Sequence, residues 1–190
     1  LKYEKVEKTV LNALKKISGH KKIVRLQGSA SFALEVMILN FLSGNILVVK
    51  TGVYSDRIYK MCVFAKKNFK NIKKIEYIDW KKINNYNRKT NWILACYVET
   101  SVGLKLPIKE LYNLKKRLKC KLALDATASI GLEKNHKFAD IIGYSSCKGL
   151  FGLTGAGFIS FNDYPKNKIN SFNLDFQNHK YKKMTGPYHA

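Results

Sequence analysis

The fold is decided by a nearly unbroken apolar stretch, Trp92-Ile93-Leu94-Ala95-Cys96-Tyr97-Val98. A strand with one solvated face alternates apolar and polar residues, so a run without alternation is typical of a parallel sheet covered on both faces. Further along, Lys121-Leu122-Ala123-Leu124-Asp125 forms another short strand-like run that ends in an acid. We therefore predict a central sheet sandwiched between layers of helices.

The segments on either side of this stretch alternate between strand-like and helix-like patterns. Short β-prone runs predict strands at 22–27, 45–49, 72–78, 139–145 and 157–161, and apolar residues at three- and four-residue spacing predict helices at 4–18, 32–42, 56–68 and 107–117. Strands that alternate with helices imply an α/β fold with a mainly parallel sheet and right-handed crossovers. The pattern weakens from about Asp163 into Asn, Lys and aromatic residues, and no element is left there to form a second domain.

The composition indicates a globular chain with a large positive charge. Its 190 residues fit about one domain, and 46% hydrophobic residues are enough for a packed core. A net charge of +22 would ordinarily favour binding to nucleic acid or to an anionic surface. The lysines are spread among Asn and Ile along the chain instead of forming one basic stripe, so nucleic-acid binding is not expected as the main function.

No apolar run is long enough to span a membrane. The longest, 32–42, is broken by Glu35 and Asn40 and falls short of the ~20 residues that a spanning helix needs. The chain begins at Leu1 without a secretory pattern, so we expect a cytoplasmic, trimmed protein. The four cysteines form no CxxC pair, and we expect free buried thiols without zinc or disulfides: Cys62, Cys96, Cys120 and Cys147.

Polar motifs follow four of the predicted strands, and ligands of open α/β sheets bind beyond the carboxyl ends of strands. Gly28-Ser29-Ala30-Ser31 could offer backbone N–H groups and hydroxyls to a phosphate at a helix start, although an ordinary serine cap has the same composition. Asp125 could keep a cofactor's ring nitrogen protonated, or it could cap the turn that follows.

The other two motifs follow the strands at 92–98 and 139–145. Lys148, flanked by Cys147 and Gly149, could act as a Schiff-base nucleophile and proton shuttle if it lies at a buried strand end; a solvated surface lysine is the alternative. The hydroxyls in Glu99-Thr100-Ser101-Val102-Gly103 could reach a ring substituent, or they could serve a turn.

Taken in order, these motifs resemble the class V aminotransferases of PLP fold type I, most closely the 2-aminoethylphosphonate transaminases. The resemblance runs from about residue 26 to residue 187. Its most specific part is 145–158, which aligns without a gap to the family's Ser-Ser-Asn-Lys-Cys-Leu-Gln-Gly-Val-Pro-Gly-Phe-Gly-Phe. The resemblance implies that Lys148 binds pyridoxal 5′-phosphate (PLP) as a Schiff base, with Cys147 in the place of the family's Asn.

The resemblance also assigns the phosphate and stacking contacts. Gly52-Val53-Tyr54-Ser55-Asp56-Arg57 looks like the family's Gly-x-aromatic-Gly-x-Arg segment and implies that Tyr54 stacks on the pyridine ring. The segment 26–31 looks like Leu-Gln-Gly-Ser-Gly-Thr, the phosphate-cradling turn of the family. Phosphate contacts are thereby implied for three residues: Ser29, Ala30 and Ser31.

Three further segments complete the implied site. The segment 99–103 is similar to Glu-Thr-Thr-Thr-Gly, which implies a contact with the ring oxygen from Ser101 first and Thr100 second. The segment 124–131 resembles Val-Asp-Ala-Met-Ser-Ser-Phe-Gly, which gives Asp125 the pyridine nitrogen and places Thr127 beside the ring. The segment 184–187 looks like Phe-Thr-Pro-Pro, in which Thr185 would reach the phosphate of the neighbouring subunit in a homodimer.

By resemblance, the chain transfers the amino group of 2-aminoethylphosphonate to pyruvate, giving phosphonoacetaldehyde and alanine. Residues 1–190 would be the large PLP-binding domain, and the family's N-terminal segment and small C-terminal domain would lie outside this chain. Alanine–glyoxylate or serine–pyruvate transamination is the alternative in the same fold. A PLP-dependent lyase or cysteine desulfurase is less favoured, because those enzymes usually carry His where this chain has Cys147. A non-catalytic basic module is the alternative from another class.

Overall fold

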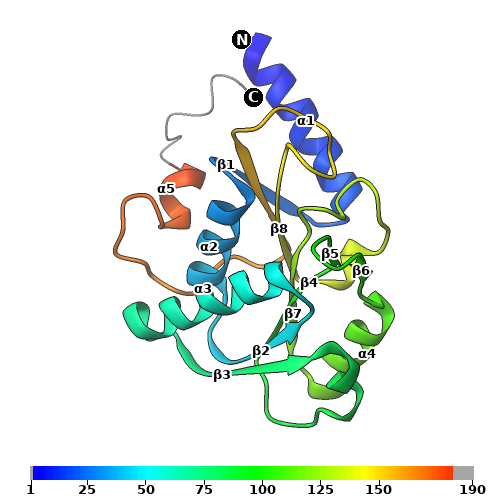
Figure 1. Cartoon of the computed structure of the whole chain (residues 1–190). Helices are drawn as coiled ribbons and strands as arrows, with labels where there is room; N and C mark the ends of the chain where they lie inside the picture. The colour runs from blue at the N-terminus through cyan, green and yellow to red at the C-terminus, as the bar shows by residue number, and fades with distance from the viewer. Residues whose placement is uncertain (1, 182–190) are drawn as a thin grey trace.

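The structure is a computed structural model that describes residues 2–181, and it has three layers, with a central sheet between helices (Figure 1). Seven strands lie in the order β1-β9-β8-β7-β4-β2-β3. Their bounds are β1 Lys22–Gln27, β2 Gly44–Lys50, β3 Ile72–Asp79, β4 Trp92–Cys96, β7 Lys121–Asp125, β8 Ile141–Ser145 and β9 Ala156–Phe161. Six of these strands run in the same direction, and β9 runs in the opposite direction between β1 and β8. The predicted, mainly parallel α/β fold is confirmed.

Helices bury both faces of this sheet. One face packs against α2 (Ala30–Phe41), α3 (Val53–Phe69) and the short α5 (Phe176–Tyr181), and the other packs against α1 (Lys2–Ser18) and α4 (Ile108–Leu118). In β2, Ile46 and Val48 point into the first core while Leu47 and Val49 point into the second. Successive strand residues face opposite sides, so a sheet covered twice needs unbroken apolar runs. None of the helices in the described range is long and apolar enough to cross a membrane.

The predicted strand 92–98 is broken after Cys96. There the Tyr97 N–H donates to the Asp125 carbonyl (3.0 Å), and the chain leaves the sheet to form a separate hairpin, β5 (Val98–Glu99) with β6 (Leu104–Lys105). Two connections contain a short 3₁₀ turn in place of an α-helix. The turn η1 (Trp80–Asn85) lies between β3 and β4, and the turn η2 (His136–Phe138) lies between β7 and β8.

A short helix, α5, lies in the part of the chain after Asp163 where the sequence pattern weakens. Phe176 starts α5 and packs edge-on against Phe41 and Phe161, with ring centroids 5.1 and 5.4 Å away. Asn40, buried in α2, donates to the Leu174 carbonyl and accepts from the Phe176 N–H. The helix is held by these long-range contacts, which a six-residue sequence window does not reveal.

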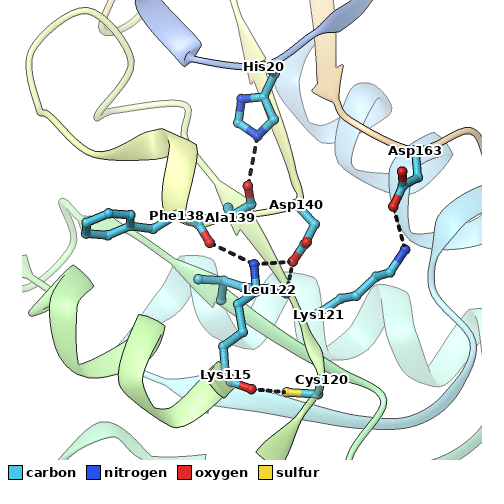
Figure 2. A network of polar contacts seen from close by, with 9 residues as sticks. All are labelled: His20, Lys115, Cys120, Lys121, Leu122, Phe138, Ala139, Asp140 and Asp163. Carbon is cyan, nitrogen blue, oxygen red and sulfur yellow. Dashed lines mark hydrogen bonds and ion pairs between the residues drawn. The ribbon is translucent and has the colours of Figure 1, made fainter. Parts of the chain in front are cut away.

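The amino edge of the sheet is tied by a polar network (Figure 2). Asp140 accepts from the Leu122 N–H (2.7 Å) and pairs with Lys115 (2.8 Å), while Lys121 pairs with Asp163 (3.0 Å). A cavity of about 290 Å³ at this edge includes Lys121, Asp140 and Asp163 in its lining and contains none of the predicted site residues. The expectation of four buried thiols holds for Cys62 and Cys96, but Cys120 and Cys147 are only half-buried.

A buried histidine makes the stability of the chain depend on pH. His136 is 1% exposed; its Nε2 lies 2.9 Å from Ser129 Oγ, and its Nδ1 has no hydrogen-bond partner in the described part of the chain. Burial lowers the pKa of His136 from 6.5 to about 4. Protonation therefore favours the unfolded chain, and stability present above pH ~6.5 is lost as the pH falls toward ~4, by about 3 kcal/mol.

Urea unfolding at pH 7 and pH 4.5 measures this loss, with His136→Gln as the comparison. The variant is expected to lose less stability between the two pH values, because glutamine carries no titrating ring. Part of the dependence will remain, since burial also lowers the pKa of His20. An unchanged pH dependence in the variant would contradict the assignment to His136.

Candidate active site

The predicted motifs meet at the carboxyl edge of the parallel strands. β2, β7 and β8 end at Lys50, Asp125 and Ser145, and each predicted segment within residues 2–181 follows one of these ends or lies at the end of β1 or β5. Direct bonds join the motifs there: Arg57 contacts Ser31, and the Gly149 N–H donates to the Thr127 carbonyl (3.1 Å). Residues far apart in the sequence therefore share one edge, as expected for the ligand edge of such a sheet.

The N-terminus of α2 has the features of an anion site. Ser29 is the N-cap, and its Oγ accepts from the Phe32 N–H, so the ordinary capping role expected as the alternative is present. The N–H groups of Ala30 and Ser31 have no acceptor within residues 2–181, and the first turn of α2 carries no acid. Free N–H groups and the positive end of the helix dipole attract an anion such as phosphate.

Arg57 adds a positive charge at this place. Its Nη1 donates to Ser31 Oγ (3.1 Å), and its guanidinium lies 5.0 Å from the centroid of the Tyr54 ring. Arg57 belongs to the motif 52–57, and no role was predicted for it from the sequence. Its position three residues after Tyr54 was the available signal, but its contact with Ser31, 26 residues earlier, is visible only in the structure.

Asp125 offers one carboxylate oxygen to the site. Its Oδ1 accepts from both the N–H (2.9 Å) and the hydroxyl (2.6 Å) of Thr127, while Oδ2 makes no hydrogen bond in the described part of the chain. The residue is 6% exposed, and burial raises its pKa, opposed by the bonds from Thr127. Asp125 thus caps the following turn, as the alternative interpretation had it, and retains an acceptor for a ligand.

Lys148 lies on the surface, as in the alternative of a solvated lysine, and not at a buried strand end. β8 is buried up to Ser145, but the chain then turns outward through residues 146–152, where the Gly152 N–H bonds back to the Ser146 carbonyl (2.8 Å). Lys148 is exposed, and its Nζ makes no hydrogen bond or ion pair within residues 2–181. Cys147 beside it is half-buried, with Sγ 3.5 Å from Ser145 Oγ. The amine is therefore accessible.

The turn that carries Asp125 and the loop that carries Lys148 pack closely at Gly149. A Cβ on Gly149 would lie 2.3 Å from the Ile130 carbonyl oxygen, nearer than atoms can approach. We therefore expect Gly149→Ala to force the two segments apart and to lower the free energy of unfolding by about 1–3 kcal/mol. Urea unfolding checks this, and a change within ~0.5 kcal/mol of wild type would speak against a tight contact.

The hydroxyls of segment 99–103 differ in their surroundings. Ser101 Oγ donates to Glu99 Oε1 (2.5 Å) and accepts from the Val53 N–H (3.2 Å), which places it at the start of α3, next to Tyr54. Thr100 is exposed. The buried carboxylate of Glu99, for which no role was predicted from the sequence, accepts hydrogen bonds from Ser101 and from the first turn of α3. Thr185 lies outside the described residues.

The sequence of the chain matches a known protein family. A family model, aminotransferase class-V, matches residues 1–184. The chain belongs to the class-V aminotransferases. This family depends on PLP, and the arrangement of helices and strands is that of PLP fold type I, as the sequence resemblance implied.

Individual relatives agree with this assignment. A 2-aminoethylphosphonate–pyruvate transaminase from Pseudomonas aeruginosa is 26% identical over 185 residues, which cover 90% of this chain and 50% of the relative. The enzyme of that name from Phocaeicola vulgatus is 25% identical over 168 residues, 80% of this chain and 46% of the relative. This class-V aminotransferase chain therefore spans about half the length of the curated relatives it matches.

Solved structures share its fold at lower identity. An aspartate aminotransferase of subgroup IV from Thermus thermophilus superimposes with a TM-score of 0.77 at 19% identity, covering 92% of this chain and 53% of its own. A pyridoxamine–pyruvate aminotransferase from Mesorhizobium loti gives 0.76 at 18% identity, covering 90% and 48%.

Proposed function

We propose that this chain is the PLP-binding domain of a transaminase and that Lys148 holds the cofactor. The observation that carries the proposal is the bond between the Gly149 N–H and the Thr127 carbonyl, which brings the lysine loop against the turn of Asp125. An accessible amine and a buried carboxylate with a free oxygen then share the ligand edge of the sheet. PLP, when bound, supplies the electron sink that amino-group transfer needs.

The residues at this edge match the chemical groups of PLP. A dianionic phosphate suits the free N–H groups of Ala30 and Ser31, with the Arg57 guanidinium beside them. The Tyr54 ring offers a stacking surface. The remaining contacts of this proposed cofactor site follow from the resemblance: Ser29, Thr100, Ser101, Thr127, Cys147 and, from a second subunit, Thr185.

Two side chains would do the chemical work. The Lys148 amine, which is accessible and unpaired within residues 2–181, can attack a carbonyl carbon and, once released, carry a proton to or from the substrate's reacting carbon. Asp125 Oδ2, which accepts no hydrogen bond within residues 2–181, would offer a negative charge to a pyridine nitrogen and so favour the protonated ring. The bonds from Thr127 to Oδ1 fix the orientation of this carboxylate.

For the substrates we propose 2-aminoethylphosphonate as donor and pyruvate as acceptor. The ungapped match of 145–158 to the family motif supports this, as do the names of relatives 25–26% identical to the chain. The test is a panel of donors added to the PLP-loaded chain, with the cofactor's absorbance followed. Conversion by 2-aminoethylphosphonate, with phosphonoacetaldehyde formed and little response to serine, is expected; alanine, the product of the pyruvate half-reaction, is expected to convert the cofactor in the reverse direction. Conversion by alanine or serine with none by 2-aminoethylphosphonate would favour the alanine–glyoxylate or serine–pyruvate alternative.

We also propose that two copies pair over this edge. Large apolar side chains on the segments after the strands are 57–80% exposed, which is costly in a monomer: Val53, Val102, Leu132, Phe151 and Leu153. A second copy would cover them and bring its own Thr185 near the phosphate. Sedimentation equilibrium tests this, and a monomeric mass at micromolar concentration would count against it.

A further inference from the structure

The start of α3 is held by side chains of the segment 99–101. Its N-cap, Gly52, has no side chain to bond the free N–H groups of the first turn. The Val53 N–H donates to Ser101 Oγ (3.2 Å), the Tyr54 N–H to Glu99 Oε1 (3.3 Å) and the Ser55 N–H to Glu99 Oε2 (3.1 Å). A distant segment therefore satisfies three of the four N–H groups that a helix start leaves unpaired, and the fourth, that of Gly52, donates to Ser55 Oγ (2.9 Å).

Glu99 is a wholly buried carboxylate, 0% exposed, and no lysine, arginine or histidine within residues 2–181 pairs with it. Besides the two N–H groups, Oε1 accepts from the Ser101 hydroxyl (2.5 Å) and Oε2 from the Thr51 hydroxyl (3.1 Å). Burying a charge is costly unless it is fully hydrogen-bonded, and here four donors and the positive end of the α3 dipole stabilise it. The carboxylate is therefore held in place at the start of α3.

Gly52 makes room for this arrangement. A Cβ there would lie 2.9 Å from both Cγ and Cδ of Glu99 and 2.7 Å from Ser101 Oγ. The backbone of Gly52 is extended (φ 169°), so the need for glycine at this position is one of space. The lack of a side chain at the cap lets the carboxylate reach the helix.

We propose that Glu99 is a positioning residue for the cofactor, an inference that rests on the proposed function. Through Oε1 it fixes both the backbone of Tyr54, whose ring is proposed to stack on the pyridine, and the hydroxyl of Ser101, which is proposed to contact the ring oxygen. The same helical turn carries Arg57, which reaches Ser31 at the phosphate end.

The charge of Glu99 has a second consequence. Two helices, α2 and α3, start at this edge, and either could attract a phosphate. The carboxylate occupies the N-terminus of α3 and repels anions there, while the N-terminus of α2 has free N–H groups and no acid. Glu99 thus leaves α2 as the place for the phosphate, which sets the direction in which the cofactor lies.

The test compares Glu99→Gln and Glu99→Ala with Glu110→Gln, which removes an exposed carboxylate on α4. Hydrogen exchange in the cofactor-free chain reports on the first turn of α3, and PLP titration with circular dichroism in the cofactor's absorption band reports on ring placement. Glu99→Gln keeps the size but turns one acceptor into a donor facing donors. We expect faster exchange at Tyr54 and Ser55, about tenfold weaker PLP binding and altered dichroism at saturation. Glu110→Gln is expected to match wild type in all three.

Each outcome decides the matter. Unchanged hydrogen exchange in both Glu99 variants would show that Glu99 does not hold the start of α3, and it would overturn the inference. Faster exchange with wild-type affinity and dichroism would make Glu99 a helix cap only and would also overturn the inference. If wild type itself does not bind PLP, the proposed function is wrong. If wild type and Glu99→Gln both bind PLP with the same dichroism in the cofactor's absorption band, the proposed function stands and the inference about Glu99 is wrong. Should Glu99→Ala not fold, Glu99→Gln carries the comparison.

Discussion

Lys148→Ala is expected to abolish covalent attachment of PLP and to lower the rate of amino-group transfer by about a thousandfold or more. The amine is the group proposed both to bind the cofactor's carbonyl carbon and to move the proton, and no other residue can take over its place on the loop. The neighbouring Cys147 is half-buried. Because Lys148 is exposed and its amine makes no hydrogen bond or ion pair within the described range, its removal is not expected to unfold the chain.

The measurement is borohydride reduction of the PLP-treated protein, followed by peptide mass spectrometry. The matched control is Lys67→Ala, which removes another exposed lysine near the far end of α3. Wild type and the control are expected to carry the reduced cofactor on the Lys148 peptide. Equal labelling in Lys148→Ala, spread over other lysines of this basic chain, would mean that the cofactor attaches nonspecifically and that the proposed site is wrong.

Asp125→Asn is expected to lower the transamination rate by about a hundredfold or more while leaving the chain at least as stable as wild type. Asparagine can still accept both bonds from Thr127, so the turn is preserved, but it brings no negative charge to the ring nitrogen. Burial raises the pKa of Asp125 above its unfolded value. The stability that this residue contributes is therefore present at low pH and lost as the pH rises through the folded pKa, so the ionised form is a cost at neutral pH.

Two measurements together test this prediction: the rate of cofactor conversion by the amino donor, and urea unfolding of the cofactor-free chain at pH 7. Asp163→Asn is the control, and the expected change in its stability has the opposite sign. Asp163 is exposed, and its hydrogen bond with Lys121 lowers its pKa, so its ionised form stabilises the folded chain. The control should keep its rate and lose a little stability. A full rate in Asp125→Asn would remove Asp125 from the mechanism, and a marked loss of stability would show that the carboxylate serves the fold instead.

The strands and their order in the sequence could be predicted because burial on both faces leaves a local trace. Apolar runs such as 121–125 and 157–161 coincide with β7 and β9 to within one residue. The end of β4 was harder to predict: Tyr97 is as apolar as its neighbours, and only the bond from the Leu106 N–H to its carbonyl (2.9 Å) shows that the chain has turned into the hairpin of β5 and β6. Likewise α5 depends on the packing of Phe176 against Phe41 and Phe161.

The sequence by itself determined the layered α/β fold, the family and the order of the motifs, because apolar periodicity and short motifs are local properties. The tertiary structure alone decided that Lys148 is exposed, that Arg57 reaches Ser31, and that Glu99 caps α3 across 44 residues or more. These are contacts between segments whose separation in the chain says nothing of their distance in space. They arise because parallel strands deliver their carboxyl ends, and the loops that follow, to one edge of the sheet.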